Sequence, residues 1–245
     1  MSAGVWLLVV GVCDLLRASR DATSVRRRLL LVLAGVAALL FAGVSSRFSA
    51  GWWGTVGACW LVGFVAWVVT SSLALDPSSS HRDRWRTAAF VCFAVALGLL
   101  VLVGARPLPE SGLWTWMADR TLVGAVGGAR FVTDLGVALA MLSTSNVLVR
   151  LALDAVGVPA VTNEKQLRGG RLLGPMERLF LLILATAGQV AAGSAVVAAK
   201  GLLRYPELRS GHDRGPTDVS EYFLIGSFAS WLLALGGWTL LRVVG

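Results

Sequence analysis

The sequence predicts an all-α protein, a polytopic bundle of transmembrane helices with about seven spans. Of its 245 residues, 56% are hydrophobic and 15% are charged, whereas a soluble domain carries about 25% charged residues. The apolar residues occur in long blocks and do not repeat on one helical face, which is typical of membrane helices. Ten tryptophans accompany them, and indoles are enriched where lipid meets water.

Seven apolar blocks predict the spans, since a run of about 17–25 apolar residues crosses a bilayer as a helix. In chain order they cover residues 3–16, 29–44, 51–75, 87–103, 131–153, 175–199 and 219–244. The first two are short and require tilting or a locally thinner bilayer. The first is expected to be retained, because it has no basic n-region and no small-residue cleavage site follows it. Counts of six and eight spans are the alternatives.

The connectors predict how the chain crosses the membrane. Counting Lys and Arg in alternate connectors places twelve on one side and seven on the other, with Arg130, Arg150 and Arg178 left out. Because cytoplasmic loops are enriched in basic residues, we expect a cytoplasmic (inner) membrane protein with its N-terminus outside and its C-terminus in the cytoplasm. Residues 1–245 are predicted as a single membrane domain, with basic polar loops at 154–174 and 200–218. Anionic lipid headgroups are the expected partners of the basic cytoplasmic loops.

The remaining composition argues against several classes of function. The net charge of +8 comes from short connectors without a groove-reading or base-stacking motif, so no nucleic acid is expected as a partner. Cys13, Cys59 and Cys92 are isolated in apolar runs, and the two histidines fall in separate loops. Neither a metal site nor a cofactor is therefore predicted. No motif of a known catalytic class is present, so enzymatic activity is not favoured.

The sixth predicted span carries a regular series of polar residues. Arg178, Gln189 and Lys200 are eleven residues apart, which is close to three helical turns, so they share one face. In one continuous helix Arg178 and Lys200 would be about 33 Å apart, and each would reach a membrane interface. Gln189 would then lie near the midplane and point into the bundle, with another helix as its favoured partner and a ligand or water as alternatives. Pro175 and Glu177 are expected in the first helical turn.

The fifth span has two interpretations. Arg130 and Asp134 are one helical turn apart, and one interpretation is a pair that neutralises itself on entering the membrane. The other is a polar pathway in which Asp134 and Asn146 face a cavity shared with Gln189. Asp14, near the end of the first span, is expected at the interface.

The seventh span begins with a pattern typical of helix capping, in which Asp218 is followed three residues later by Glu221. Capping alone is one explanation of Glu221. The other is an ion pair with Lys200 or Arg204, because antiparallel sixth and seventh spans would bring these residues to the same side of the membrane.

The C-terminal third resembles the closing region of a bacterial family of multi-helix membrane proteins known only as a domain of unknown function. The resemblance lies in the stretches LRGGRLLGPMERLFLLILATAGQ, AAKGLLRYPEL and EYFLIGSFAS. Its elements are Gly170, Arg171, Glu177, Arg178, Gln189, Ala199, Lys200, Arg204, Glu221, Tyr222 and Gly226. The resemblance implies a membrane location and marks these positions for testing, and it supplies no activity.

Three functions fit these predictions. The leading one is a transporter-like or lipid-handling protein with a polar intramembrane site lined by Asp134, Asn146 and Gln189. The second is a non-catalytic subunit or scaffold, whose small-residue helix faces bind another membrane protein or a second copy of the chain. The third is a membrane enzyme that acts on a lipid phosphate and uses basic residues as anion contacts, namely Arg178, Lys200 and Arg204.

Overall fold

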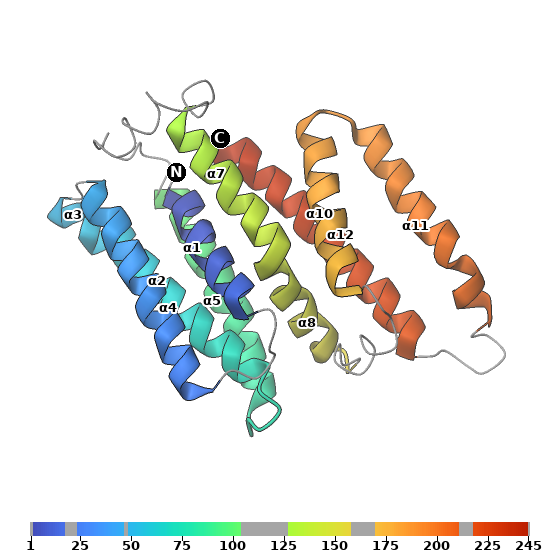
Figure 1. The fold of residues 1–245 in the computed structure, drawn as a ribbon, viewed down its shortest axis with the longest axis horizontal. Coiled ribbons are helices and arrows are strands. Elements are labelled where there is room, and N and C mark those ends of the chain that lie inside the picture. The colour runs from blue at the N-terminus through green and yellow to red at the C-terminus, as the bar shows by residue number, and fades with distance from the viewer. Residues whose placement is uncertain are drawn as a thin grey trace. The chain divides into compact units, whose positions relative to one another are not determined.

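The computed structural model describes residues 2–17, 24–46, 49–103, 127–157, 170–210 and 218–244, and within the last two ranges the side chains of 173–202 and 223–244. All regular structure in these ranges is helical, which confirms the predicted all-α class. The elements are α1 (Ser2–Arg17), α2 (Val25–Ser45), α3 (Ala50–Trp52), π-helical η1 (Trp53–Gly57), α4 (Ala58–Ala74), α5 (Arg82–Val103), α7 (Gly128–Leu139), π-helical η3 (Ala140–Thr144), α8 (Ser145–Ala155), α10 (Gly170–Thr186), α11 (Val190–Ser210) and α12 (Asp218–Val244) (Figure 1).

Among the described residues, five continuous helical segments are long and apolar enough to cross a membrane. They are Val25–Ser45, Ala50–Ala74, Arg82–Val103, Gly128–Ala155 and Phe223–Val244. Three further helices, α1, α10 and α11, complete the described set, and the apolar part of α11 is only Val190–Leu202. The protein is therefore a multi-pass helical membrane bundle, and about seven spans agree with its described helices.

The chain forms two compact units. Unit 1 contains Met1–Thr144 with Leu240–Gly245, and unit 2 contains Ser145–Thr239. In unit 1 the close approach of α1 to α7 depends on glycine. A Cβ atom on Gly136 would overlap the carbonyl oxygen of Gly4, and a Cβ atom on Gly4 would overlap the backbone of Thr133. Small residues allow two membrane helices to pack backbone to backbone in this way.

The core of unit 1 is aromatic. Trp6, Trp60 and Trp67 have no exposed surface, so these three indoles do not lie at a lipid–water boundary as the composition suggested. The Trp6 indole N–H donates to the Trp60 carbonyl at 3.2 Å, and the Trp60 indole N–H donates to the Ser2 carbonyl at 3.1 Å. The Phe93 ring on α5 packs against Trp6 and Trp67, with centroids 5.5 and 4.8 Å apart. Buried indoles require such partners for their N–H groups, and these bonds fix α1 against α4.

The prediction of one continuous helix over residues 175–199 is wrong. In unit 2, α10 ends at Thr186 and α11 begins at Val190, and Figure 1 shows the two helices running in opposite directions from the turn between them. Gly188 has φ +73°. Its N–H bonds to the Ala185 carbonyl at 3.2 Å, and the next N–H, that of Gln189, bonds to the Leu184 carbonyl at 2.8 Å. This pair of bonds around a left-handed glycine is the Schellman helix end.

The start of α10 also differs from the prediction. The helix begins at Gly170, five residues before Pro175, so this proline lies inside the helix and Glu177 lies in its middle. Helix also continues into both predicted polar loops, because α10 starts within 154–174 and α11 extends to Ser210. The seventh predicted span agrees closely with α12, which starts at Asp218.

Candidate functional site

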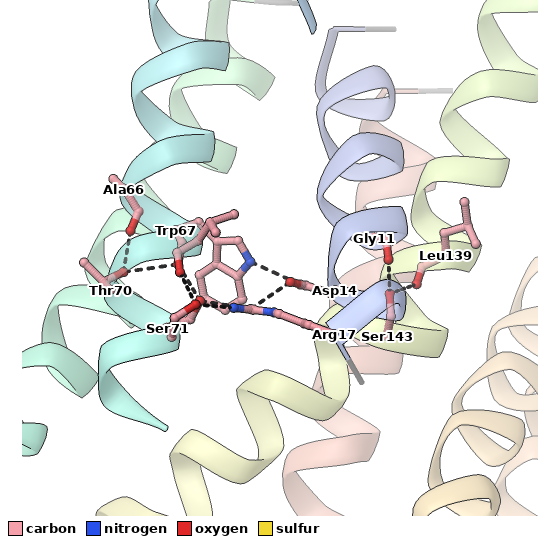
Figure 2. Close-up of polar contacts among 11 residues, drawn as sticks. Gly11, Asp14, Arg17, Ala66, Trp67, Thr70, Ser71, Leu139 and Ser143 are labelled. Atoms are coloured by element: carbon pink, nitrogen blue, oxygen red, sulfur yellow. Dashed lines mark hydrogen bonds and ion pairs between the residues drawn. The ribbon is translucent and has the colours of Figure 1, made fainter. Parts of the chain in front are cut away.

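A buried charged cluster joins α1 to α4 in unit 1. We call it the Asp14 cluster, and its members are Asp14, Arg17, Trp67, Ser71 and Ser72. Figure 2 labels Asp14, Arg17, Trp67 and Ser71 of this cluster. Asp14 is 1% exposed and Arg17 is 6% exposed. Their ion pair is 2.7 Å long, and the Trp67 indole N–H donates to the other carboxylate oxygen at 3.1 Å. The Arg17 guanidinium also donates to the Ser71 and Ser72 hydroxyls at 2.9 and 3.1 Å.

The Asp14 cluster is arranged to hold two helices together. Its two serines donate their own hydroxyl protons to carbonyls of α4, which leaves their oxygens free to accept from Arg17. The π-helical segment η3 adds a bond on the other side of α1, where the Ser143 hydroxyl donates to the Gly11 carbonyl at 2.7 Å. Asp14 is buried in protein against Trp67, and its expected position at the membrane interface stays a prediction. The carboxylate and the guanidinium neutralise each other, and their bonds join α1 to α4. The Asp14 cluster therefore has a structural role.

A second cluster brings together four helices of unit 2. We call it the Glu177 cluster, and its members are Asn146 on α8, Glu177 and Arg178 on α10, Lys200 on α11, and Phe223, Ser230 and Trp231 on α12. Arg178 is 1% exposed. Its guanidinium donates to the Ser230 hydroxyl at 2.8 Å and to the Asn146 side-chain oxygen. Arg178 therefore joins α10 to α8 and α12.

The neighbouring Glu177 has a different set of partners. One carboxylate oxygen forms an ion pair with Lys200, and the other accepts the Trp231 indole N–H at 2.9 Å. The Lys200 ammonium also lies 5.5 Å from the centre of the Phe223 ring and 5.8 Å from that of Trp231. The side chain of Glu177 is 7% exposed and that of Lys200 is 19% exposed.

The charged residues of the Glu177 cluster, and Ser230, lie near the middle of their helices. Ser230 is twelve residues from the start of α12 and fourteen from its end, or about 18 and 21 Å at 1.5 Å per residue. Lys200 is likewise in the middle of α11, and Glu177 in the middle of α10. Arg178 and Lys200 were expected at opposite membrane interfaces. That prediction is wrong, because the turn at Gly188 folds α11 back and both cations meet at Glu177.

Other sequence-predicted site residues lie elsewhere. Gln189 is exposed in the turn between α10 and α11, so the prediction that it points into the bundle is wrong. Arg130 is exposed and Asp134 is half-buried on α7 in unit 1, and no ion pair joins these two described residues, which corrects the predicted i,i+4 pair. The side chains of Arg204 and Glu221 fall outside the described ones, so the predicted pairing of Glu221 remains a prediction.

The partners supplied by α4 and α12 were not identified from the sequence. Two signals were available. Ser71 and Ser72 form a polar group at the end of an otherwise apolar block, and Ser230 with Trp231 interrupts another apolar block near its middle. Within the described ranges no group of His, Cys, Asp and Glu side chains is arranged to hold a metal ion.

The resemblance of the C-terminal third to a family of unknown function remains a prediction, although Glu177, Arg178 and Lys200, three of the residues that carry it, meet in the Glu177 cluster. The function must be argued from the clusters themselves, because no family model, curated protein or solved structure matches this chain.

Proposed function

We propose that the protein is a lipid-handling or transporter-like protein of the cytoplasmic membrane, and that the Glu177 cluster is its ligand-binding site. The observation that supports this proposal is the meeting of Glu177, Arg178 and Lys200 near the middle of α10 and α11, against the membrane-length helix α12. Ionisable groups at such depth are costly and are commonly functional. The site replaces the predicted one of Asp134, Asn146 and Gln189, of which the Glu177 cluster contains only Asn146.

The packing of α11 favours ligand entry at this cluster over the Asp14 cluster. No described residue of α11 is buried, and Val190 and Leu202 are 65% and 74% exposed. The Asp14 cluster, in contrast, lies between α1 and α4, whose facing side chains are buried. A ligand that reaches the Glu177 cluster along α11 therefore displaces little protein packing.

The proposal is tested by native mass spectrometry of the protein released from detergent micelles. We expect a stoichiometric bound small molecule or lipid in the wild-type protein, and its loss in Glu177→Gln and Asn146→Ala variants that retain their thermal stability. Gln189→Ala is the matched control, since Gln189 is a polar residue of the same hairpin outside the cluster. Retention of the ligand by folded cluster variants, or its equal loss in the control, would contradict the proposal.

A non-catalytic subunit is the second candidate function, and the exposed face of α11 favours it. Ala191, Ala195 and Ala198 follow one another at helical spacing on this face, and all three are exposed. Small residues at this spacing let a further membrane helix approach closely. A partner helix would be recovered in a fixed ratio with the wild-type protein and lost from Ala195→Leu. Val95→Leu, at an exposed apolar position of α5, is the control.

The third candidate, an enzyme for a lipid phosphate, stays a prediction.

We also propose that α10 and α11 each cross the membrane, which gives eight crossings and both termini outside. The extra crossing moves the basic residues after α11 to the side of the other basic connectors. Fourteen Lys and Arg then lie on the cytoplasmic side and four on the other, with Lys200 now also left out as a residue inside α11. The fourteen are Arg17, Arg20, Arg26, Arg27, Arg28, Arg82, Arg84, Arg86, Lys165, Arg168, Arg171, Arg204, Arg209 and Arg214, and the four are Arg47, Arg106, Arg120 and Arg242.

This division is steeper than the twelve and seven of the seven-span prediction, and a strong bias of basic residues toward the cytoplasm is the usual pattern in membrane proteins. It also places every strongly basic connector against the inner leaflet. Anionic headgroups are therefore the proposed lipid partners of this side.

A further inference from the structure

Three side chains of the Glu177 cluster surround a cation. Glu177 supplies a carboxylate, and the rings of Phe223 and Trp231 lie 5.5 and 5.8 Å from the Lys200 ammonium. A carboxylate with aromatic rings within about 6 Å of the charge is the arrangement by which proteins bind organic ammonium groups. We call Glu177, Phe223 and Trp231 the cation cage.

The cage is organised independently of its occupant. The Trp231 indole N–H donates to one oxygen of Glu177 at 2.9 Å, and this bond orients both the carboxylate and the ring. The other oxygen of Glu177 faces Lys200. Phe223 and Trp231 of the cage belong to α12, and Glu177 belongs to α10. The helix α11 therefore contributes only Lys200, whose ammonium occupies the cage.

The occupant is held more loosely than its neighbour Arg178. Arg178 is 1% exposed and is bonded to two further helices, α8 and α12. Lys200 has a side chain that is 19% exposed, on a helix without a buried described residue. That helix is joined to α10 by the short turn at Gly188, whose φ of +73° only glycine adopts readily. Lys200 can therefore leave the cage by a movement of α11 without disturbing Arg178.

Resting on the function proposed above, we propose that the ligand of this site carries a primary ammonium group, which takes the place of Lys200 in the cation cage. If Lys200 leaves, the buried carboxylate of Glu177 requires another cation, because an unpaired buried charge is strongly destabilising. Phosphates and neutral headgroups do not meet this need. A primary ammonium also donates an N–H to Glu177, which a quaternary ammonium cannot do. An aminolipid headgroup and a free alkylamine share this chemistry.

The first test empties the cage by Lys200→Ala in nanodiscs of phosphatidylglycerol. We expect butylammonium to raise the unfolding temperature of this variant saturably, with a smaller rise from tetramethylammonium and none from butanol. The wild-type protein, freed of its own ligand in these nanodiscs, should need at least about tenfold more butylammonium, because Lys200 then occupies the cage and lowers the fraction open to the amine. The double variant Lys200→Ala/Glu177→Gln should not respond. An equal response to butanol, or a response of the double variant, would overturn the proposal.

A second measurement does not depend on the folding of Lys200→Ala. In the wild-type protein, hydrogen exchange across Val190–Leu202 should be faster when butylammonium is added to phosphatidylglycerol nanodiscs, or when phosphatidylethanolamine replaces phosphatidylglycerol. The first result identifies a free amine and the second an aminolipid, and both support the cage. Unchanged exchange under both conditions, or the same acceleration in Glu177→Gln, contradicts it.

The tests of the cation cage and of the proposed function can fail independently. A ligand that depends on the Glu177 cluster but lacks an amine would leave the proposed function standing and reject the cation cage. An amine response of the emptied cage without any ligand bound to the wild-type protein would support the cage and reject the proposed function.

Discussion

At the scale of single residues, burial decides what an ion pair contributes. The chain contains two Asp–Arg pairs with the same i,i+3 spacing in very different surroundings. In the Asp14–Arg17 pair the two side chains are 0% and 6% exposed, whereas in Asp83–Arg86 they are 89% and 15% exposed. The two pairs have the same residue types and the same spacing and differ in burial. Comparing them therefore isolates the effect of burial on an ion pair.

We predict that Asp14→Ala lowers the free energy of unfolding by about 3–5 kcal/mol, because Arg17 is left as a buried charge without its carboxylate. Asp83→Ala should change it by only about 0–1 kcal/mol, since that carboxylate is solvated and screened. Thermal and denaturant unfolding in detergent micelles measures both. Replacing Asp14 and Arg17 together by leucine should cost less than Asp14→Ala alone. Similar losses from Asp14→Ala and Asp83→Ala would show that the Asp14 pair contributes no more than a surface pair.

A second residue-scale prediction concerns pH and the turn between α4 and α5. The Ser78 hydroxyl and backbone N–H donate to Asp76 Oδ1 at 2.6 and 3.0 Å. These bonds, the hydroxyl first, hold the pKa of Asp76 below its ordinary value of 3.8. The bonds therefore stabilise the folded turn above the ordinary carboxyl pKa, and this stabilisation is lost as the pH falls through the lowered one. Ser78→Ala should raise the Asp76 pKa in a carboxyl ¹³C NMR titration, and an unchanged midpoint would refute the assignment.

At the scale of elements, the turn between α10 and α11 is the feature that reorganises unit 2. One left-handed glycine converts a predicted 25-residue span into a hairpin of two helices. Gly188 followed by the polar Gln189 is a common helix ending and was the available signal for the turn. The long apolar block and the eleven-residue spacing of polar residues instead favoured one continuous helix.

We predict that Gly188→Ala destabilises the protein by about 1–2 kcal/mol, the cost of a left-handed conformation for a residue with a Cβ atom. Gly201→Ala, inside α11, is the control, and it should be neutral or stabilising by about 0.5–1 kcal/mol. An added Cβ atom has open space at both positions, so the backbone alone separates them. Thermal unfolding of the two variants decides the matter, and equal responses would argue against a Schellman end at Gly188.

At the scale of the whole molecule, the hairpin changes the number of times the chain crosses the membrane. With seven spans, reporter fusions after Arg28 and after Arg214 would lie in opposite compartments. With the eight crossings proposed here we predict that both fusions report the cytoplasm, and that a reporter in the Gln189 turn reports the outside. A paired reporter assay with one signal on each side measures this directly. Opposite signals at Arg28 and Arg214 would restore the seven-span arrangement.

The sequence by itself determined the class of the molecule and the positions of most helices. Long apolar blocks have no stable alternative to helices in a bilayer, since every backbone polar group must be satisfied within the segment. For this reason α2, α5 and α12 follow the blocks that predicted them. Spacing along one helix also placed Arg178 and Lys200 on a polar face, but only under the assumption that the helix was continuous.

Tertiary structure alone decided which polar residues meet. Asp14 is held by Trp67, and Arg17 by Ser71, on a helix more than fifty residues away. Glu177 is held by Lys200 from across a turn and by Trp231 from α12. Composition and periodicity describe how one segment partitions between lipid and water. They carry no information on which neighbour shares a buried charge, because that depends on the crossing of helices far apart in the chain and, here, on the sign of one glycine φ angle.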